Sequence, residues 1–135
     1  MSEPSDRLLR MTPLPAHACD CHMHIYDQRF PAVAGARLLP PDALVPKYRR
    51  LQARLGLART VVVTPSTYGT DNAILLDALE QFGAGARGVA VLDTSVTDDE
   101  LQRLHMAGVR GIRFNQTLST VTPIEMLEPL AARIR

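Results

Sequence analysis

The chain has 135 residues, 46% of them hydrophobic, which is enough for one domain with an apolar core and excludes extensive disorder. Its 15 basic and 14 acidic residues leave a formal net charge of +1, so nothing indicates binding to nucleic acid or to an anionic membrane surface. No stretch approaches the roughly 20 apolar residues of a membrane span, and residues 1–7 lack the apolar segment of a signal peptide, so we expect a soluble cytoplasmic protein.

The order of apolar runs and helical patterns predicts an α/β fold. Residues 1–17 contain three prolines and predict an extended N-terminal arm, followed by one structural unit over residues 18–135. Short apolar runs then alternate with helical patterns, which is typical of βα units with parallel strands. The predicted strands are residues 19–25, 60–64, 88–92 and 109–115. The helices that follow them are expected to end at Gly56, Gly83, Gly108 and the last residue.

Helix starts are marked by capping residues. Thr97 with Glu100, and Thr122 with Glu125, match the capping box, in which the hydroxyl oxygen accepts a backbone N–H of the first turn. The helix after the second strand is expected to begin near Asp71.

The first predicted strand carries the sharpest chemical signal, the pair His22 and His24. Because side chains alternate along a strand, Asp20, His22 and His24 are predicted on one face. Two imidazoles on one face can bind one metal ion or together polarise a carbonyl group. The alternative is that both histidines only form hydrogen bonds within a core. Cys19 and Cys21, two residues apart in an extended strand, are not expected to form a disulfide.

The fourth predicted strand contains a second candidate, Arg113, which shares a face with Gly111 and Asn115. A guanidinium group is costly to bury unless it meets an anion, and its planar fork suits a carboxylate. We therefore include Arg113 and Asn115 among the candidate substrate-binding residues. The alternatives for Arg113 are an ion pair with an interior carboxylate or a position on an exposed strand.

The second predicted strand leads into a polar segment. Alternation places Val62, Thr64 and Ser66 on one face, with the polar members toward the carboxyl end, where (βα) barrels build their active sites. Residues 66–72 offer hydroxyl and amide donors at a helix start, which can bind a carboxylate or phosphate group. The alternative is a capped turn in which Gly69 adopts a positive φ.

Four segments carry a family resemblance: Ala-Cys-Asp-Cys-His-Met-His-Ile-Tyr-Asp at 18–27, Tyr-Gly-Thr-Asp-Asn at 68–72, Arg-Gly-Val-Ala at 87–90, and the run from Leu104 to Asn115. As a set they resemble the amidohydrolase-related family of the metal-dependent hydrolase superfamily. More narrowly, they resemble its branch of 2-pyrone-4,6-dicarboxylate hydrolases and D-galactarolactone isomerases. The resemblance extends from about residue 16 to the end of the chain.

The resemblance implies a (β/α)8 TIM barrel, of which this chain would hold the first four βα units. It implies that His22 and His24 polarise a lactone carbonyl or bind zinc and that Arg113 binds a substrate carboxylate. The turn formed by Ser66, Thr67 and Tyr68 would contact the substrate.

The family also implies that an Asp of the eighth strand activates water and that a further His comes from the sixth strand. Because the chain contains neither strand, we expect little or no turnover from it alone. Leu38 and Ser119 replace a Tyr and an Arg of the pyrone hydrolases, which favours a less anionic substrate such as a sugar-acid lactone.

The leading hypothesis is a lactonase-type hydrolase that acts on a sugar-acid or dicarboxylate-type lactone by histidine-assisted attack of water, without a cofactor. Its ligand would be a small lactone or carboxylate. One alternative is a zinc-dependent amidohydrolase or decarboxylase that uses the same two histidines. Another is a non-catalytic half barrel that pairs with a second copy or with a missing C-terminal half, because an open sheet leaves two unpaired edges.

Overall fold

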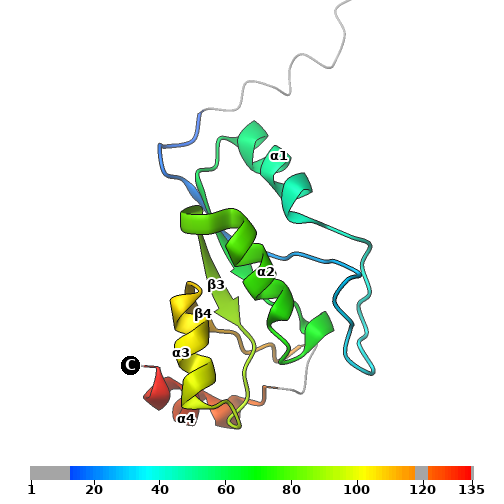
Figure 1. Cartoon of the computed structure of the whole chain (residues 1–135), viewed down its shortest axis with the longest axis vertical. Helices are drawn as coiled ribbons and strands as arrows, with labels where there is room; N and C mark the ends of the chain where they lie inside the picture. Colours follow the sequence, from blue (N-terminus) through cyan, green and yellow to red (C-terminus); the bar gives the residue numbers. More distant parts are fainter. Residues whose placement is uncertain (1–12, 118–121, 135) are drawn as a thin grey trace, which may run out of the picture.

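A parallel four-stranded sheet forms the centre of the molecule (Figure 1). The computed structural model describes residues 13–117 and 122–134. The strands lie in chain order and consist of β1 (Cys19–Met23), β2 (Arg59–Val63), β3 (Ala86–Ala90) and β4 (Val109–Ile112). The predicted alternation of strands and helices is therefore confirmed, although β4 ends three residues earlier than expected. Most of the predicted N-terminal arm lies outside the described residues.

Each strand is followed by a helix. The α-helices are α1 (Val45–Leu55), α2 (Ala73–Phe82), α3 (Asp98–Met106) and α4 (Leu127–Arg133), and the short 3-10 helices are η2 (Ser66–Tyr68), η3 (Gly83–Gly85) and η4 (Ile124–Met126). In the described part of the chain, no helix is long and apolar enough to cross a membrane.

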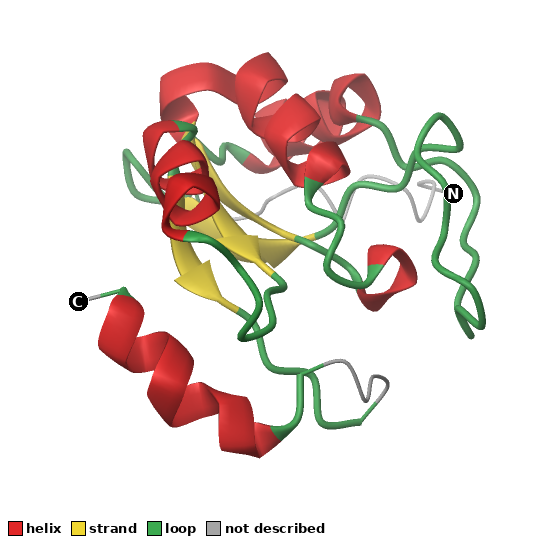
Figure 2. Ribbon diagram, turned by 60° about the horizontal axis from the view of Figure 1, so that its bottom comes forward, coloured by secondary structure: helices red, strands yellow, loops and turns green. Residues whose placement is uncertain are grey.

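Helices α1, α2 and α3 cover one face of the sheet, whereas α4 lies beyond β4 (Figure 2). The main apolar core fills the space between the sheet and these three helices, and α2 contributes four of its buried side chains: Ile74, Leu75, Ala78 and Leu79. We call the opposite side of the sheet the inner face, because it corresponds to the interior of a closed barrel.

The strand registers show which residues point toward the helices. Thr60 pairs with Ala86 and Val62 with Gly88, and a side chain at Gly88 would contact Leu79 of α2. Since partners in register share a face, Thr60 and Val62 point to the helices. Thr64 continues this face and donates a hydrogen bond to Asn72 at the start of α2 (2.7 Å). The prediction that Val62 and Thr64 share a polar mouth with Ser66 is therefore wrong.

A bulge in β1 corrects a second prediction. Asp20 pairs with Thr60, but the register shifts before Met23 pairs with Val62. The shift places two β1 residues opposite one residue of β2, and it separates Asp20 from the face of the two histidines. Asp20 and Met23 instead lie on the helix side.

On that side, Asp20 takes part in a structural hydrogen-bond network. The Tyr48 hydroxyl of α1 donates to Asp20 Oδ2 at 2.7 Å and lies 3.2 Å from Thr60 Oγ1. Burial, with the neighbouring carboxylate, raises the pKa of Tyr48 to about 12, so its phenol remains protonated and able to donate.

The capping predictions have mixed outcomes. Thr97 caps α3 as expected, because its side chain accepts from the Glu100 N–H at 3.1 Å. Thr122 does not cap a helix: it is buried, and its hydroxyl oxygen accepts from the Asn115 N–H at 3.4 Å. The helical segment here begins with η4 at Ile124, and α4 ends at Arg133 rather than at the last residue.

The close approach of α2 to β3 requires glycine at position 88. A Cβ at Gly88 would lie 2.8 Å from Leu79 Cδ1 and 3.1 Å from Val109 Cγ2. We expect Gly88→Ala to lower the free energy of unfolding by about 1 to 3 kcal/mol through overpacking, measured by urea denaturation. Gly111→Ala is the matched control, because the nearest atom there lies at 3.5 Å. Equal losses for the two variants would contradict this account.

Candidate functional site

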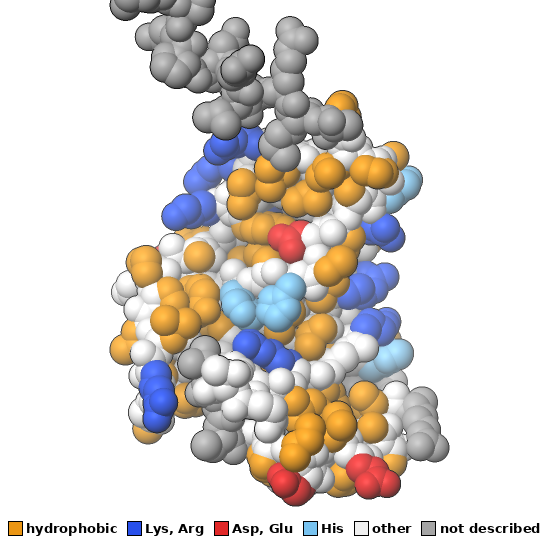
Figure 3. Space-filling view, turned by 180° about the vertical axis from the view of Figure 1, so that it is seen from behind, with side chains coloured by type: hydrophobic (Ala, Val, Ile, Leu, Met, Phe, Trp, Pro, Cys, Tyr) orange, Lys and Arg blue, Asp and Glu red, His pale blue; other side chains and the backbone are white. Residues whose placement is uncertain are grey.

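His22 and His24 lie together on the inner face, with ring centroids 5.0 Å apart in an edge-to-face arrangement. Figure 3 shows this side of the molecule, with a pair of histidine side chains near its middle and a basic side chain beside them. The apolar residues that flank the pair, Met23 and Ile25, are buried toward the helices. The bulge of β1 thus leaves both imidazoles on the same side of the sheet, as the alternation predicted.

The backbone determines the tautomer of His24. Its Nδ1 lies 2.7 Å from the carbonyl oxygen of Val63 on β2. Because a carbonyl oxygen only accepts, Nδ1 must carry the hydrogen. Burial lowers the pKa of His24, and the positive charge of Arg113 adds to this effect. A neutral His24 with hydrogen on Nδ1 leaves Nε2 as a hydrogen-bond acceptor.

Arg113 follows the end of β4 and points to the same region. Its backbone N–H donates to Ala90 O at 2.8 Å, and its Nη1 donates to Thr64 O at 3.0 Å. The side chain is half-buried, and burial lowers its pKa. Over the described ranges 13–117 and 122–134, no carboxylate forms an ion pair with Arg113. The interior ion pair considered for it is thus not found there, and most of its donors remain available to an anion.

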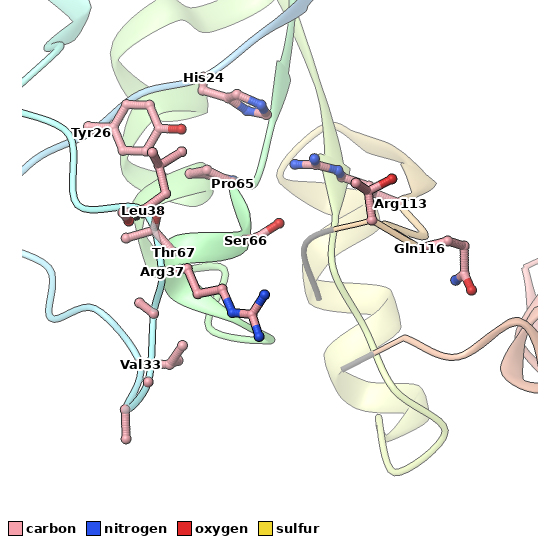
Figure 4. A pocket seen from close by; sticks show the side chains of 14 residues that line it. His24, Tyr26, Val33, Arg37, Leu38, Pro65, Ser66, Thr67, Arg113 and Gln116 are labelled. Carbon is pink, nitrogen blue, oxygen red and sulfur yellow. Dashed lines mark hydrogen bonds between the residues drawn. The ribbon is translucent and has the colours of Figure 1, made fainter. Parts of the chain in front are cut away.

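An open cavity of about 460 Å³ lies at the carboxyl ends of the strands. Figure 4 shows side chains from three sources around it: the end of β1 with the loop that follows, the β2–η2 junction, and the segment after β4. None of the lining residues is Asp or Glu. The lining consists of His24, Tyr26, Val33, Ala34, Gly35, Ala36, Arg37, Leu38, Pro65, Ser66, Thr67, Arg113, Gln116 and Thr117.

The predicted substrate-binding residues occupy different positions around this cavity. Ser66 and Thr67 line it. Asn115 lies beside it and donates through Nδ2 to Ser66 Oγ at 2.7 Å, which joins the segment after β4 to η2. Tyr68 is buried, and its hydroxyl group accepts from the backbone N–H of Asp27 at 3.1 Å, so it anchors the loop after β1.

Tyr26, Arg37 and Gln116 are among the lining residues that sequence reasoning missed. Tyr26 continues the alternation of the two histidines, and its ring centroid lies 6.1 Å from that of His24. Extending the predicted strand pattern by two residues would have identified Tyr26. Arg37 lies in a long loop without regular secondary structure, for which strand or helix periodicity gives no signal.

The buried amide of Asn72 holds the carboxyl ends of β2 and β3 in place. Its Oδ1 accepts from Thr64 Oγ1 at 2.7 Å and from the Val91 N–H at 3.0 Å, and its Nδ2 donates to Val91 O at 2.9 Å and to Thr70 O at 3.0 Å. Both acceptor positions of Oδ1 and both hydrogens of Nδ2 are therefore satisfied inside the protein. This clamp positions the strand ends that carry the cavity walls.

The described residues do not by themselves form a metal centre. The hydrogen bond from His24 Nδ1 to a backbone carbonyl is typical of metal-binding histidines, because it orients Nε2. However, no group of three or more His, Cys, Asp or Glu side chains within the described ranges is arranged to hold a metal ion. The Arg113 charge next to His24 also disfavours a second cation there.

Parallel βα units with polar side chains gathered at the carboxyl ends of the strands are the arrangement on which (βα) barrels build their sites. The amidohydrolase family model matches residues 19–134, and the chain belongs to this family.

Named relatives and a solved structure agree with the assignment. The chain is 42% identical over 125 residues to a 2-pyrone-4,6-dicarboxylate hydrolase of Comamonas testosteroni, covering 90% of the chain and 41% of the relative. It is 35% identical to a 4-sulfomuconolactone hydrolase of Rhizobium radiobacter (75% and 34% covered) and 34% identical to a D-galactarolactone isomerase of Agrobacterium fabrum (84% and 40% covered). The apo crystal structure of an Agrobacterium tumefaciens protein matches with a TM-score of 0.84 at 28% identity.

The match to that crystal structure covers 90% of this chain and 45% of the other. The chain thus spans between about one third and two fifths of the length of these curated relatives and somewhat under half of the solved structure. The predicted family and the predicted fold, four βα units that match half of a barrel, are confirmed.

The Asn72 clamp predicts a large loss of stability on truncation. Asn72→Ala leaves the buried N–H and carbonyl of Val91 without side-chain partners, at a cost of about 2 to 4 kcal/mol in the free energy of unfolding. Thr64→Val is the milder control and removes one hydrogen bond, for about 1 kcal/mol. Urea denaturation of both variants measures the difference, and an Asn72→Ala loss no larger than that of Thr64→Val would refute the clamp.

The lowered pKa of His24 predicts a pH dependence. The folded state binds a proton at His24 less readily than the unfolded state does, so the stability due to neutral His24 is present above pH 6.5 and is lost as pH falls. We expect NMR titration to place the His24 pKa below 6.5, with the hydrogen of the neutral ring on Nδ1.

The effect on stability can be measured by urea denaturation at several pH values, with the variant His24→Asn, whose side chain does not titrate. The difference in unfolding free energy between the parent protein and His24→Asn should shrink as the pH is lowered below 6.5. The exposed His105 of α3 provides the control variant His105→Asn. A difference that stays constant with pH for His24→Asn would contradict the predicted burial effect.

Proposed function

We propose that this chain forms the part of a lactone hydrolase that binds the substrate's carboxylate and faces its ester carbonyl. One observation carries the proposal: Arg113 is half-buried at a cavity, beside a neutral His24, with no carboxylate partner in the described residues. A guanidinium group held in this way is suited to a carboxylate ligand, which it can bind through two parallel hydrogen bonds.

The relatives support the type of substrate. Two of them are named as hydrolases of 2-pyrone-4,6-dicarboxylate and of 4-sulfomuconolactone, and a third as an isomerase of D-galactarolactone. All three names denote cyclic esters that carry acidic groups or derive from sugar acids. Arg113 would bind the acidic group of such a ring and so hold its ester group in the cavity beside His24.

The proposed reaction is the addition of water to the ring ester. The water oxygen bonds to the carbonyl carbon while one proton of the water passes to a base. The ring C–O bond then breaks, the ring oxygen takes that proton and leaves as a hydroxyl group, and the product is a hydroxy acid. Neutral His24 accepts through Nε2 and can take up the water proton as a general base. Among the described residues no carboxylate lines the cavity to assist, and we accordingly propose little turnover by residues 1–135 alone.

The zinc-dependent alternative uses the same imidazole differently. The hydrogen bond from Nδ1 of His24 to Val63 O would also orient Nε2 toward a metal ion. Metal analysis of the purified protein distinguishes the zinc-dependent mechanism from base catalysis by His24. Stoichiometric zinc that is lost in His24→Ala would favour the zinc-dependent mechanism.

Substitution of Arg113 tests whether this residue binds the carboxylate of the substrate. We expect Arg113→Gln to weaken the binding of 2-pyrone-4,6-dicarboxylate at least about tenfold, because a charged hydrogen-bonded contact is lost, and to leave the weak binding of neutral 2-pyrone unchanged. Isothermal titration calorimetry measures both. Arg110→Gln removes the same charge from an exposed residue of β4 and should bind like the parent protein. Unchanged dicarboxylate binding by Arg113→Gln would refute the proposal.

A further inference from the structure

The cavity has a second guanidinium group, that of Arg37, on the wall formed by the loop between β1 and α1. In Figure 4 this side chain extends from its loop toward the side of the cavity where Arg113 lies. Within the described residues, no hydrogen bond or ion pair involves the Arg37 side chain, and the residue is exposed. Its charge is therefore available to a ligand.

The Arg37 loop is held against the cavity at two points. The Val33 N–H donates to Thr67 O at 2.9 Å, and Thr67 Oγ1 donates to Leu38 O at 2.8 Å. Between them, the Ala36 N–H donates to Val33 O at 3.1 Å and closes a turn. Both anchors use Thr67 of η2, so the segment that carries Arg37 is tied to the same short helix that lines the cavity. A tethered backbone loses less entropy when its side chain binds a ligand.

Packing at Gly69 reinforces this attachment. A Cβ there would lie 2.9 Å from Val33 Cγ1, and the residue has a φ of +54°. Glycine therefore lets the loop after β1 approach the end of η2 closely. The position of Arg37 thus follows from contacts of neighbouring loop residues, Val33 and Leu38, and not from a partner of its own side chain.

The charges of the cavity point to the kind of ligand. Arg37 and Arg113 contribute two positive charges from different elements, and none of the lining residues is Asp or Glu. Two guanidinium groups that share a cavity without a counter-ion repel each other until an anion is bound. A ligand with two separated carboxylates satisfies both, and the cavity of about 460 Å³ is large enough for a small ring that carries them.

We propose that Arg37 is a specificity-determining residue that binds a second substrate carboxylate, so that the site selects a dicarboxylate lactone over a monocarboxylate one. This inference rests on the proposed function, since it takes Arg113 as the site of the first carboxylate. It also revises the expectation of a less anionic substrate. Leu38 and Ser119 lack the polar groups expected at their positions, but Arg37 supplies a charge from the residue next to Leu38, whereas Ser119 lies outside the described residues.

The test compares two unreactive probes that differ by one carboxylate, benzene-1,3-dicarboxylate and benzoate. Isothermal titration calorimetry at low salt gives the affinity of the whole chain and of its variants Arg37→Gln, Arg113→Gln and Arg50→Gln. Arg50 is exposed on α1 and away from the cavity, so its variant controls for the loss of one positive charge. Circular dichroism confirms the fold of each variant.

We expect Arg37→Gln to weaken dicarboxylate binding about tenfold and to change benzoate binding less than twofold. Arg113→Gln should weaken both probes, and Arg50→Gln neither. If binding depends on Arg113 while Arg37→Gln leaves the dicarboxylate preference intact, the role of Arg37 is overturned and the proposed function stands. If neither probe binds in a manner that depends on Arg113, the proposed function fails and the inference fails with it.

Discussion

The site depends on one buried side-chain amide, that of Asn72. Its hydrogen bonds reach Thr64 after β2, Val91 after β3 and Thr70 before α2, three backbone segments that leave regular secondary structure at the same edge of the sheet. Where a parallel strand ends, its next backbone N–H and carbonyl groups have no partner on a neighbouring strand. A buried side-chain amide can bond both, because it carries a donor and an acceptor. With these ends held together, the residues that follow β2 form a fixed wall of the cavity.

The two faces of the sheet have different roles: the helix face holds the core, and the inner face holds the histidines. The helix face buries the apolar core and also the polar network of Asp20, Tyr48 and Thr60. The bulge in β1 produces this division, because it turns Asp20 away from the histidines that follow it. Asp20, the acidic residue nearest the pair in the sequence, thereby forms a hydrogen bond with Tyr48 of α1. The described residues that line the cavity include histidine and arginine but no carboxylate. The electrostatic character of the cavity therefore suits an anionic ligand.

Local patterns predicted much of this fold. Thr97 with Glu100 marked the start of α3, Gly56 and Gly83 marked the ends of α1 and α2, and four apolar runs marked the strands. These features depend on interactions between residues a few positions apart. The same approach failed at Thr122, which resembles a capping residue but is buried and contacts Asn115 instead.

The sequence by itself determined the fold class, the family motifs and the shared face of His22 and His24, because alternation along a strand is a property of the local backbone. Only the tertiary structure decided that Asp20 faces α1, that the Val63 carbonyl sets the His24 tautomer, and that Arg37 lies at the same cavity as Arg113. Each depends on contacts between segments far apart in the chain or on an irregularity such as the bulge. No periodic pattern encodes such contacts, since they arise only when the strands pair and the loop after β1 packs on η2.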